Sequence, residues 1–345
     1  MTPTLVFDTY WRFAAERHAM YLRRFAAPEG PWTDDPILTK YRFTNVYRVL
    51  DRVSQYLIRE VIYRHDRSQD ADEVIYRILL FKIFNKIETW EELERHFGPI
   101  TIKHPSPEAL DSFLSRLMQA GKRIYSAAYI MPSPKLGGER KHTNHIRLLQ
   151  LMFEDRIYIS VCRANSLSGV YERLRAYPGL GDFLAFQYTI DLNYSHVIDF
   201  SEMDLVVAGP GARDGISKCF ADADHLSAEE IINYMVEAQG REFERRGLDF
   251  AGLFGRPLQP IDCQNIFCEI SKYARAAHPD VPGVAGRTRI KQNFKRSPRP
   301  QQPPMLPPKW KILVPQFSSQ TFSPRSHTQL DMFEAALTRS ISGVK

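Results

Sequence analysis

Carboxylates are concentrated in a short stretch near the middle of the 345-residue sequence. Asp191, Asp199, Glu202 and Asp204 lie within fourteen residues, and the glycine turn Gly209-Pro-Gly-Ala follows them. A carboxylate held in a pocket could act as a general base or could bind a metal ion. The alternative interpretation is that these residues cap helices and supply surface charge.

A second group of polar residues falls on one face of a predicted helix over Lys40–Arg64. At roughly 100° per residue, its aliphatic side chains point to the opposite face, which we expect to be buried. The polar face carries an acid-free stripe of Asn45, Arg48, Arg52, Gln55 and Arg59. Arginine interleaved with asparagine and glutamine suits contacts with phosphates and base edges. An ordinary solvated face is the alternative.

The segment 174–193 reads as two helices joined by the turn Pro178-Gly-Leu-Gly, with Asp182 as the expected N-cap of the second helix. Glycines let the backbone adopt positive φ and bring bare N–H groups to a helix N-terminus, which is an anion site suited to a DNA phosphate. This pattern is typical of a helix-hairpin-helix, with Gly179 and Gly181 as phosphate contacts. A helix corner with glycines for packing is the alternative.

The net charge of +6 is unevenly distributed along the chain. Residues 281–330 contain nine Lys or Arg and no Asp or Glu, and residues 331–345 are neutral, so residues 1–280 sum to −3. Concentrated positive charge indicates a polyanionic partner, and we expect DNA. Proline-rich runs in the same region favour a disordered or loosely docked tail from about residue 284.

The composition also excludes several classes of protein. No apolar run approaches the ~20 residues that span a bilayer, and the N-terminus lacks the layout of a secretory signal. The four cysteines form no C-x-x-C pair and have no histidine at metal-ligand spacing. We therefore expect a reduced, cytoplasmic protein without a metal, another cofactor or a membrane partner.

Aliphatic residues at spacings of three and four predict an almost entirely helical body. The expected helices, with a short one opened by a capping box at Thr89–Glu92, cover Thr4–Phe25, Lys40–Arg64, Asp72–Lys86, Ser106–Ala120, His142–Cys162 and Ser227–Arg246. Asp262 is expected to cap a further helix. Short strands at Ile157–Val161 or Leu205–Ala208 stay open as alternatives.

The predicted organisation is a helical domain over residues 1–283, a basic Pro-rich linker over 284–326 and a C-terminal peptide over 327–345. Part of that peptide resembles the Q-L-x-L-F pentapeptide by which bacterial proteins dock on the DNA polymerase sliding clamp: Gln329, Leu330, Asp331, Met332 and Phe333. An extended peptide on a disordered tether suits such docking. The alternative is the start of a small terminal amphipathic helix.

Five stretches taken in order resemble one family: 42–57, 80–90, 181–192, 206–216 and 262–273. They look like the helical domain found with phage 5-hydroxymethyl-deoxyuridine DNA kinases, also called the α-glutamyl/putrescinyl thymine pyrophosphorylase group. The resemblance covers about residues 30–280. It implies an all-α helical bundle of DNA-glycosylase-like type, acting in thymine hypermodification. Such proteins are thought to replace the (pyro)phosphate of an activated 5-hydroxymethyluracil in DNA by an amine or amino acid.

Matched position by position, the family's motifs imply two sets of site residues. The implied catalytic residues are Asp191, Asp199, Glu202, Asp262 and Glu269. The implied DNA- and phosphate-contacting residues, beside the hairpin glycines, are Asn45, Arg48, Asp51, Arg52, Asn85, Gln187, Gly209 and Gly211. These 345 residues contain no G-x-x-x-x-G-K-[ST] loop, so phosphorylation of the base would come from a separate DNA-base kinase.

Three functions stay open. The first is a DNA base-modifying transferase, which would need the target base flipped out of the duplex. The second is a base-excision glycosylase, because in helix-hairpin-helix glycosylases an essential aspartate follows the hairpin at about the spacing of Asp199. The third is a non-catalytic DNA-binding partner of a DNA kinase. All three predict a salt-dependent affinity for DNA.

Overall fold

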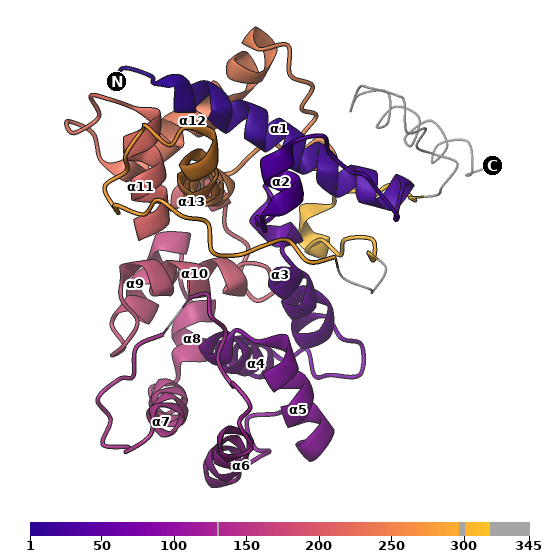
Figure 1. Ribbon diagram of the computed structural model, residues 1–345. Coiled ribbons are helices and arrows are strands. Elements are labelled where there is room, and N and C mark those ends of the chain that lie inside the picture. Colours follow the sequence, from indigo (N-terminus) through magenta and orange to yellow (C-terminus); the bar gives the residue numbers. More distant parts are fainter. Residues whose placement is uncertain (130, 297–300, 318–345) are drawn as a thin grey trace. The chain divides into compact units, whose positions relative to one another are not determined.

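The computed structural model describes residues 1–129, 131–296 and 301–317, and these residues fold into α-helices (Figure 1). This confirms the all-α class that the helical periodicity predicts. Paired extended backbone is limited, in the described ranges, to three isolated bridges, one of them between Tyr41 and Asn293. No helix in these ranges is both long and apolar enough to cross a bilayer.

The chain divides into two compact units: the described parts of Met1–Asp51, Val206–Leu306 and Lys311–Lys345, and those of Arg52–Leu205 and Pro307–Trp310. The first unit contains α1 (Leu5–Ala26), α2 (Pro36–Lys40), the 3₁₀ turn η1 (Arg48–Leu50), α11 (Pro210–Cys219), α12 (Ala228–Arg245) and α13 (Pro260–Ala277). The second unit contains α3 (Arg52–Tyr56), the π-helix η2 (Leu57–Ile62), α4 (Ala71–Phe84), α5 (Ile87–Phe97), α6 (Pro107–Gln119), α7 (Lys141–Glu154), α8 (Ile157–Cys162), α9 (Leu167–Arg175), α10 (Asp182–Leu192), η3 (Glu202–Asp204) and η4 (Pro308–Trp310).

Helix α13 is the centre of the first unit, where α1, α11 and α12 pack against it (Figure 1). The approach of α11 is close because Gly215 has no side chain, and a Cβ there would overlap the carbonyl oxygen of Phe267. On the side of α1, the Tyr10 ring contacts the rings of Trp11 and Phe267, with centroid distances of 4.9 and 4.7 Å. These buried contacts hold α13 rigidly, which matters because α13 carries part of the site.

We expect Gly215→Ala to lower the free energy of unfolding by about 1–3 kcal/mol, because α11 must move away from α13. The matched control is Gly240→Ala on α12, where a Cβ would have no described neighbour within 4 Å. That change should raise stability by roughly 0.5–1 kcal/mol, since alanine is the better helix former. Urea denaturation measures both values, and equal shifts for the two variants would contradict the close approach.

Two helices start where the sequence predicts them, each behind a serine N-cap at the first residue of the expected range. Ser106 accepts a hydrogen bond from the Ala109 N–H and opens α6. Ser227 opens α12 through a complete capping box with Glu230. The structure confirms these helix starts. They can be predicted because a cap depends on residues only three or four positions apart.

Other boundaries differ from the predictions. The expected helix 142–162 is two helices, α7 and α8, because Arg156 between them adopts a left-handed φ of 53°. The strand considered at Ile157–Val161 is therefore helical, and Leu205–Ala208 has no regular structure. Thr89 does not cap a helix: α5 begins two residues earlier, and the Thr89 hydroxyl donates to the carbonyl oxygen of Ile124.

The predicted single helix over 40–64 is wrong, and this correction changes the site. Helix α2 ends at Lys40, residues 41–47 are irregular, and η1, α3 and η2 follow. The physical reason is that one helix can bury only one face. The buried residues of this segment would point to several faces of a continuous helix: Phe43, Val46, Tyr47, Val49 and Leu50. The polar stripe therefore does not form one solvent-facing surface, because its member Arg48 is only 3% exposed while Arg52 is exposed.

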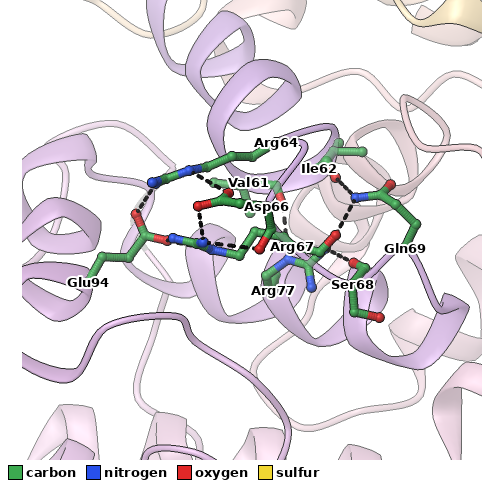
Figure 2. Close-up of polar contacts among 9 residues, drawn as sticks. All are labelled: Val61, Ile62, Arg64, Asp66, Arg67, Ser68, Gln69, Arg77 and Glu94. Atoms are coloured by element: carbon green, nitrogen blue, oxygen red, sulfur yellow. Dashed lines mark hydrogen bonds and ion pairs between the residues drawn. The ribbon is translucent and has the colours of Figure 1, made fainter.

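Arginines that follow the π-helix are engaged in local structure (Figure 2). Arg64 and Arg67 each pair with both Asp66 and Glu94, at N–O distances of 2.6 to 3.1 Å. Arg77 donates to the carbonyl oxygens of Val61 and Ser68. This network stabilises the turn between η2 and α4, so we do not count these arginines among the phosphate contacts.

The described part of the basic tail is docked, which is one of the two states that its composition predicts. In the first unit, the Phe294 N–H donates to the carbonyl oxygen of Lys40 at 3.0 Å. In the second unit, the Trp310 ring packs edge-on against Tyr194 with centroids 5.9 Å apart. Residues 318–345, with the predicted clamp-binding peptide 329–333, lie outside the described residues.

Candidate functional site

Five of the expected site residues come together in the first unit: Asn45, Arg48, Asp51, Asp262 and Glu269. They lie where the irregular segment before η1 packs against α13. Three further residues that the sequence analysis did not single out belong to the same network: Arg17, Thr44 and Asn265. We call these eight residues the Asp51 cluster.

Asp51 has an unusual ionisation. Its Oδ1 accepts a hydrogen bond from the backbone N–H of Asn45 at 2.9 Å. Burial raises the pKa of Asp51 to about 7; the Asn45 N–H and the positive charge of Arg48 oppose the shift, while the negative charge of Glu269 adds to it. The carboxyl is therefore partly protonated near neutral pH, which suits a general base or acid.

Arg17 brings a guanidinium into the cluster from α1. Its Nη2 donates to Asn45 Oδ1 at 2.6 Å, and its Nη1 is buried without a hydrogen-bond partner in the part of the chain that the structure describes. Burial lowers the pKa of Arg17 to about 10, so the group stays charged at neutral pH. A buried donor without an acceptor costs about 1–3 kcal/mol, and an anionic oxygen would supply that acceptor. The sequence signal was a charge on the apolar side of α1, four residues from Phe13 and from Tyr21.

Asp262 orders the backbone of the cluster. Its Oδ1 accepts from the Arg48 N–H at 2.9 Å, and its Oδ2 accepts from the Gln259 N–H at 3.0 Å. The second bond belongs to a capping box, so the N-cap of α13 is Gln259, and Asp262 lies three residues further on rather than at the cap. Because both carboxylate oxygens bind backbone N–H groups, we assign Asp262 a positioning role.

Glu269 and Asn265 attach the irregular segment to α13. Glu269 Oε2 accepts from the Thr44 N–H at 3.2 Å and pairs with Lys272 Nζ at 2.7 Å. Asn265 Nδ2 donates to the carbonyl oxygen of Asn45 at 2.8 Å. Residues three or four apart on one helix face thus fix the backbone that carries Asp51.

The four carboxylates of the acidic stretch 191–204 do not gather in one place. Asp191 is buried in α10 and Glu202 is buried in η3, whereas Asp199 and Asp204 are exposed. The Asp199 side chain is 76% exposed and lies 3.6 Å from Lys309 Nζ. Proximity in sequence therefore does not produce a shared carboxylate pocket here.

Asp191 instead forms a buried ion pair with Lys82 of α4, which the sequence analysis missed. The Lys82 Nζ–Asp191 Oδ2 distance is 2.6 Å, and the two side chains are 2% and 3% exposed. The Lys82 ammonium also lies 4.7 Å from the ring centroid of Tyr129. Gln187, one turn earlier on α10, is buried as well. The available signal was a lysine inside the apolar run Val74–Phe84.

The remaining expected residues lie at helix termini or on the surface. Asn85 ends α4 in a left-handed conformation with φ 47°, which asparagine tolerates well. Gly209 is the N-cap of α11, and a Cβ at Gly211 would overlap Cys268 Sγ of α13. The Arg52 side chain is 63% exposed and lies 3.5 Å from Glu88.

Helices α9 and α10 lie side by side around the predicted hairpin turn, in which Gly179 has φ 85°. The N-cap of α10 is Gly181, so the prediction that Asp182 is the cap is wrong; Asp182 pairs instead with Arg175 at 2.5 Å. A hollow of about 470 Å³ beside the turn is lined by Glu172, Arg175, Ala176, Leu180, Gly181 and Asp182. Two carboxylates against one guanidinium make this hollow a poor place for a phosphate.

No group of three or more His, Cys, Asp or Glu side chains in the described ranges is arranged to hold a metal ion.

Comparison with known proteins gives one family and one relative. The family model described as "5-hmdU DNA kinase, helical domain" matches residues 4–283. The 5-hmdU DNA kinase of Bacillus phage SP10 is 26% identical over 290 residues, which cover 79% of this chain and 45% of that protein. The chain therefore spans less than half the length of this relative. No solved structure matches.

Proposed function

Because this chain belongs to the family of 5-hmdU DNA kinase helical domains, we propose that it acts on 5-hydroxymethyluracil in DNA during thymine hypermodification. The SP10 relative is named as a kinase of this base, and the chain matches less than half of it. The 345 residues have no phosphate-binding G-x-x-x-x-G-K-[ST] loop. We place the action of these residues after the phosphorylation step, on a base that a DNA-base kinase has already phosphorylated.

The reaction we propose replaces the (pyro)phosphate on the methylene carbon of the base by an amine or amino acid. The carbon–oxygen bond breaks, a carbon–nitrogen bond forms, and the (pyro)phosphate leaves with the electron pair. The proton lost by the attacking nitrogen passes to the carboxylate of Asp51. Arg17, whose Nη1 has no hydrogen-bond partner among the described residues, would stabilise the leaving phosphate. A base stacked in a duplex would first be flipped out.

One observation carries this proposal: a carboxyl with a pKa of about 7 lies in a network with two buried arginines, within a stretch that the family model matches. A group with that pKa accepts a proton readily near neutral pH. The adjoining guanidinium groups complement a phosphate. The Asp51 cluster thus offers both functions that the substitution needs.

The test uses the whole chain, duplex DNA with phosphorylated 5-hydroxymethyluracil and a panel of amines and amino acids. Digestion to nucleosides and mass spectrometry should reveal a nucleoside carrying the amine, with release of (pyro)phosphate. Abasic sites in place of that product would favour base excision. DNA binding without any covalent change would favour the non-catalytic partner. Either result would overturn the transferase.

We also propose that residues 329–333 recruit the chain to the sliding clamp. The support for this is the sequence match alone, namely a glutamine followed by apolar anchors beyond a Pro-rich linker.

A further inference from the structure

Residues 284–296, which we call the basic strap, begin directly after the last residue that the family model matches. Backbone groups hold the strap to the first unit. The Ala285 N–H donates to Asp214 Oδ1 at 2.7 Å, and the Arg289 carbonyl oxygen accepts from Arg275 Nη1 at 3.2 Å. The Gln292 carbonyl oxygen accepts from the Arg42 N–H at 3.0 Å. Attachment through the backbone leaves most basic side chains of the strap unused.

The end of the strap is held by side chains as well. The Phe294 ring packs edge-on against Trp32, with centroids 6.2 Å apart. Arg296 pairs with Glu29 at 2.8 Å and lies over the same tryptophan at 5.6 Å. Ile290 and Phe294 are partly buried, whereas the basic residues between the anchors are exposed. The strap therefore has a fixed course over the first unit.

Six exposed cations follow this course, and the described part of the chain pairs none of them with a carboxylate: Arg287, Arg289, Lys291 and Lys295 of the strap, and Lys40 and Arg42 of the segment paired with it. No described carboxylate lies within 4.0 Å of the charged nitrogens of these six side chains. The sequence supplies no acid between residues 281 and 330. Clustered cations repel each other, and a polyanion relieves that repulsion.

We propose that the basic strap, together with Lys40 and Arg42, is a phosphate-binding track for the backbone of DNA. The choice of DNA among polyanions rests on the proposed function. Phosphates that replace bound counterions release them, which gives such a track its affinity. Gln292 and Asn293 add neutral donors among the charges, as backbone-contacting surfaces commonly do. The track would hold the duplex independently of the chemistry at Asp51.

The test compares two full-length variants that remove the same charge. The first carries Arg287→Gln, Arg289→Gln, Lys291→Gln and Lys295→Gln. The control carries Lys103→Gln, Arg123→Gln, Lys135→Gln and Arg163→Gln, four exposed residues without an ion pair in the described ranges. Fluorescence anisotropy with unmodified duplex DNA gives Kd from 50 to 200 mM salt, and thermal unfolding checks that both variants fold.

The strap variant should bind about tenfold or more weakly at 100 mM salt, and the slope of log K against log salt should fall by up to about 3.6 in magnitude, at about 0.9 per lost phosphate contact. The control should keep the wild-type slope. Equal changes in both variants, or a strap variant that loses affinity only for anionic vesicles, would overturn the proposal. Product formation by the wild-type chain is scored separately. If the strap variant loses DNA affinity but the wild-type chain forms no product, only the proposed function is contradicted. If the wild-type chain forms product but the strap variant binds DNA as tightly as the wild type, only the track is contradicted.

Discussion

Asp51→Asn is expected to lower the rate of amine transfer to phosphorylated 5-hydroxymethyluracil DNA by about 10²–10⁴-fold, the usual contribution of a general base. Asparagine keeps an oxygen for the Asn45 N–H, which Asp51 Oδ1 binds at 2.9 Å, but it cannot accept a proton. The matched control is Asp34→Asn, an exposed aspartate of the same unit outside the cluster, which should retain the wild-type rate.

The pH dependence of the transfer rate should show whether the Asp51 carboxylate is the general base. In the wild type, the rate should rise as pH increases through about 7, because only the ionised Asp51 carboxylate accepts a proton. The Asp51→Asn variant should lack that step and keep only the dependence that comes from the attacking amine. Two profiles with the same step, whatever their absolute rates, would assign the base to another residue.

Stability measurements separate loss of the base from loss of the fold. The pKa of Asp51 is raised in the folded state, so the folded chain binds more protons than the unfolded chain between about pH 4 and 7. This residue therefore lowers stability as pH rises through that window. Asparagine has no charge to desolvate, so the variant should be at least as stable as the wild type at pH 8. Lower activity with lower stability would point to a structural role for Asp51.

The parts of the fold that the sequence predicts are those set by local interactions. Helical periodicity and the caps at Ser106 and Ser227 depend on residues within one turn, and the structure confirms them. For the segment 41–51 the sequence predicts a helix, because its polar residues fit one helical face. Long-range bonds, such as that from the Arg48 N–H to Asp262, hold it in an irregular form instead.

Only part of the candidate site could be predicted from the sequence, for the same reason. Motif positions such as Asn45 and Asp51 could be named from a resemblance, but the pKa of Asp51 depends on burial, which no local pattern in the sequence indicates. Arg17 lies on α1, 28 residues before Asn45 in the sequence, and reaches the cluster only through the fold. The different surroundings of Asp191 and Asp199 also follow from the tertiary structure alone. The Asp191 side chain is buried, whereas the Asp199 side chain is exposed to solvent.

Breaking the buried Lys82–Asp191 pair should give the largest stability effect. Lys82→Met or Asp191→Leu alone should lower the free energy of unfolding by about 3–5 kcal/mol, because each leaves an uncompensated charge in the core. The double variant should recover most of this loss, since an apolar pair of similar size has no charge to desolvate. Urea denaturation of the four proteins gives the coupling energy.

An exposed pair provides the control. Lys122 and Glu92 lie 2.6 Å apart with side chains 52% and 26% exposed, so Lys122→Met should cost less than about 1 kcal/mol. Similar losses at both pairs would show that burial does not control the effect. The double variant also decides the role of Asp191. A folded Lys82→Met/Asp191→Leu chain that still transfers amine would make Asp191 structural. A folded chain without transfer would give the second unit a part in the chemistry.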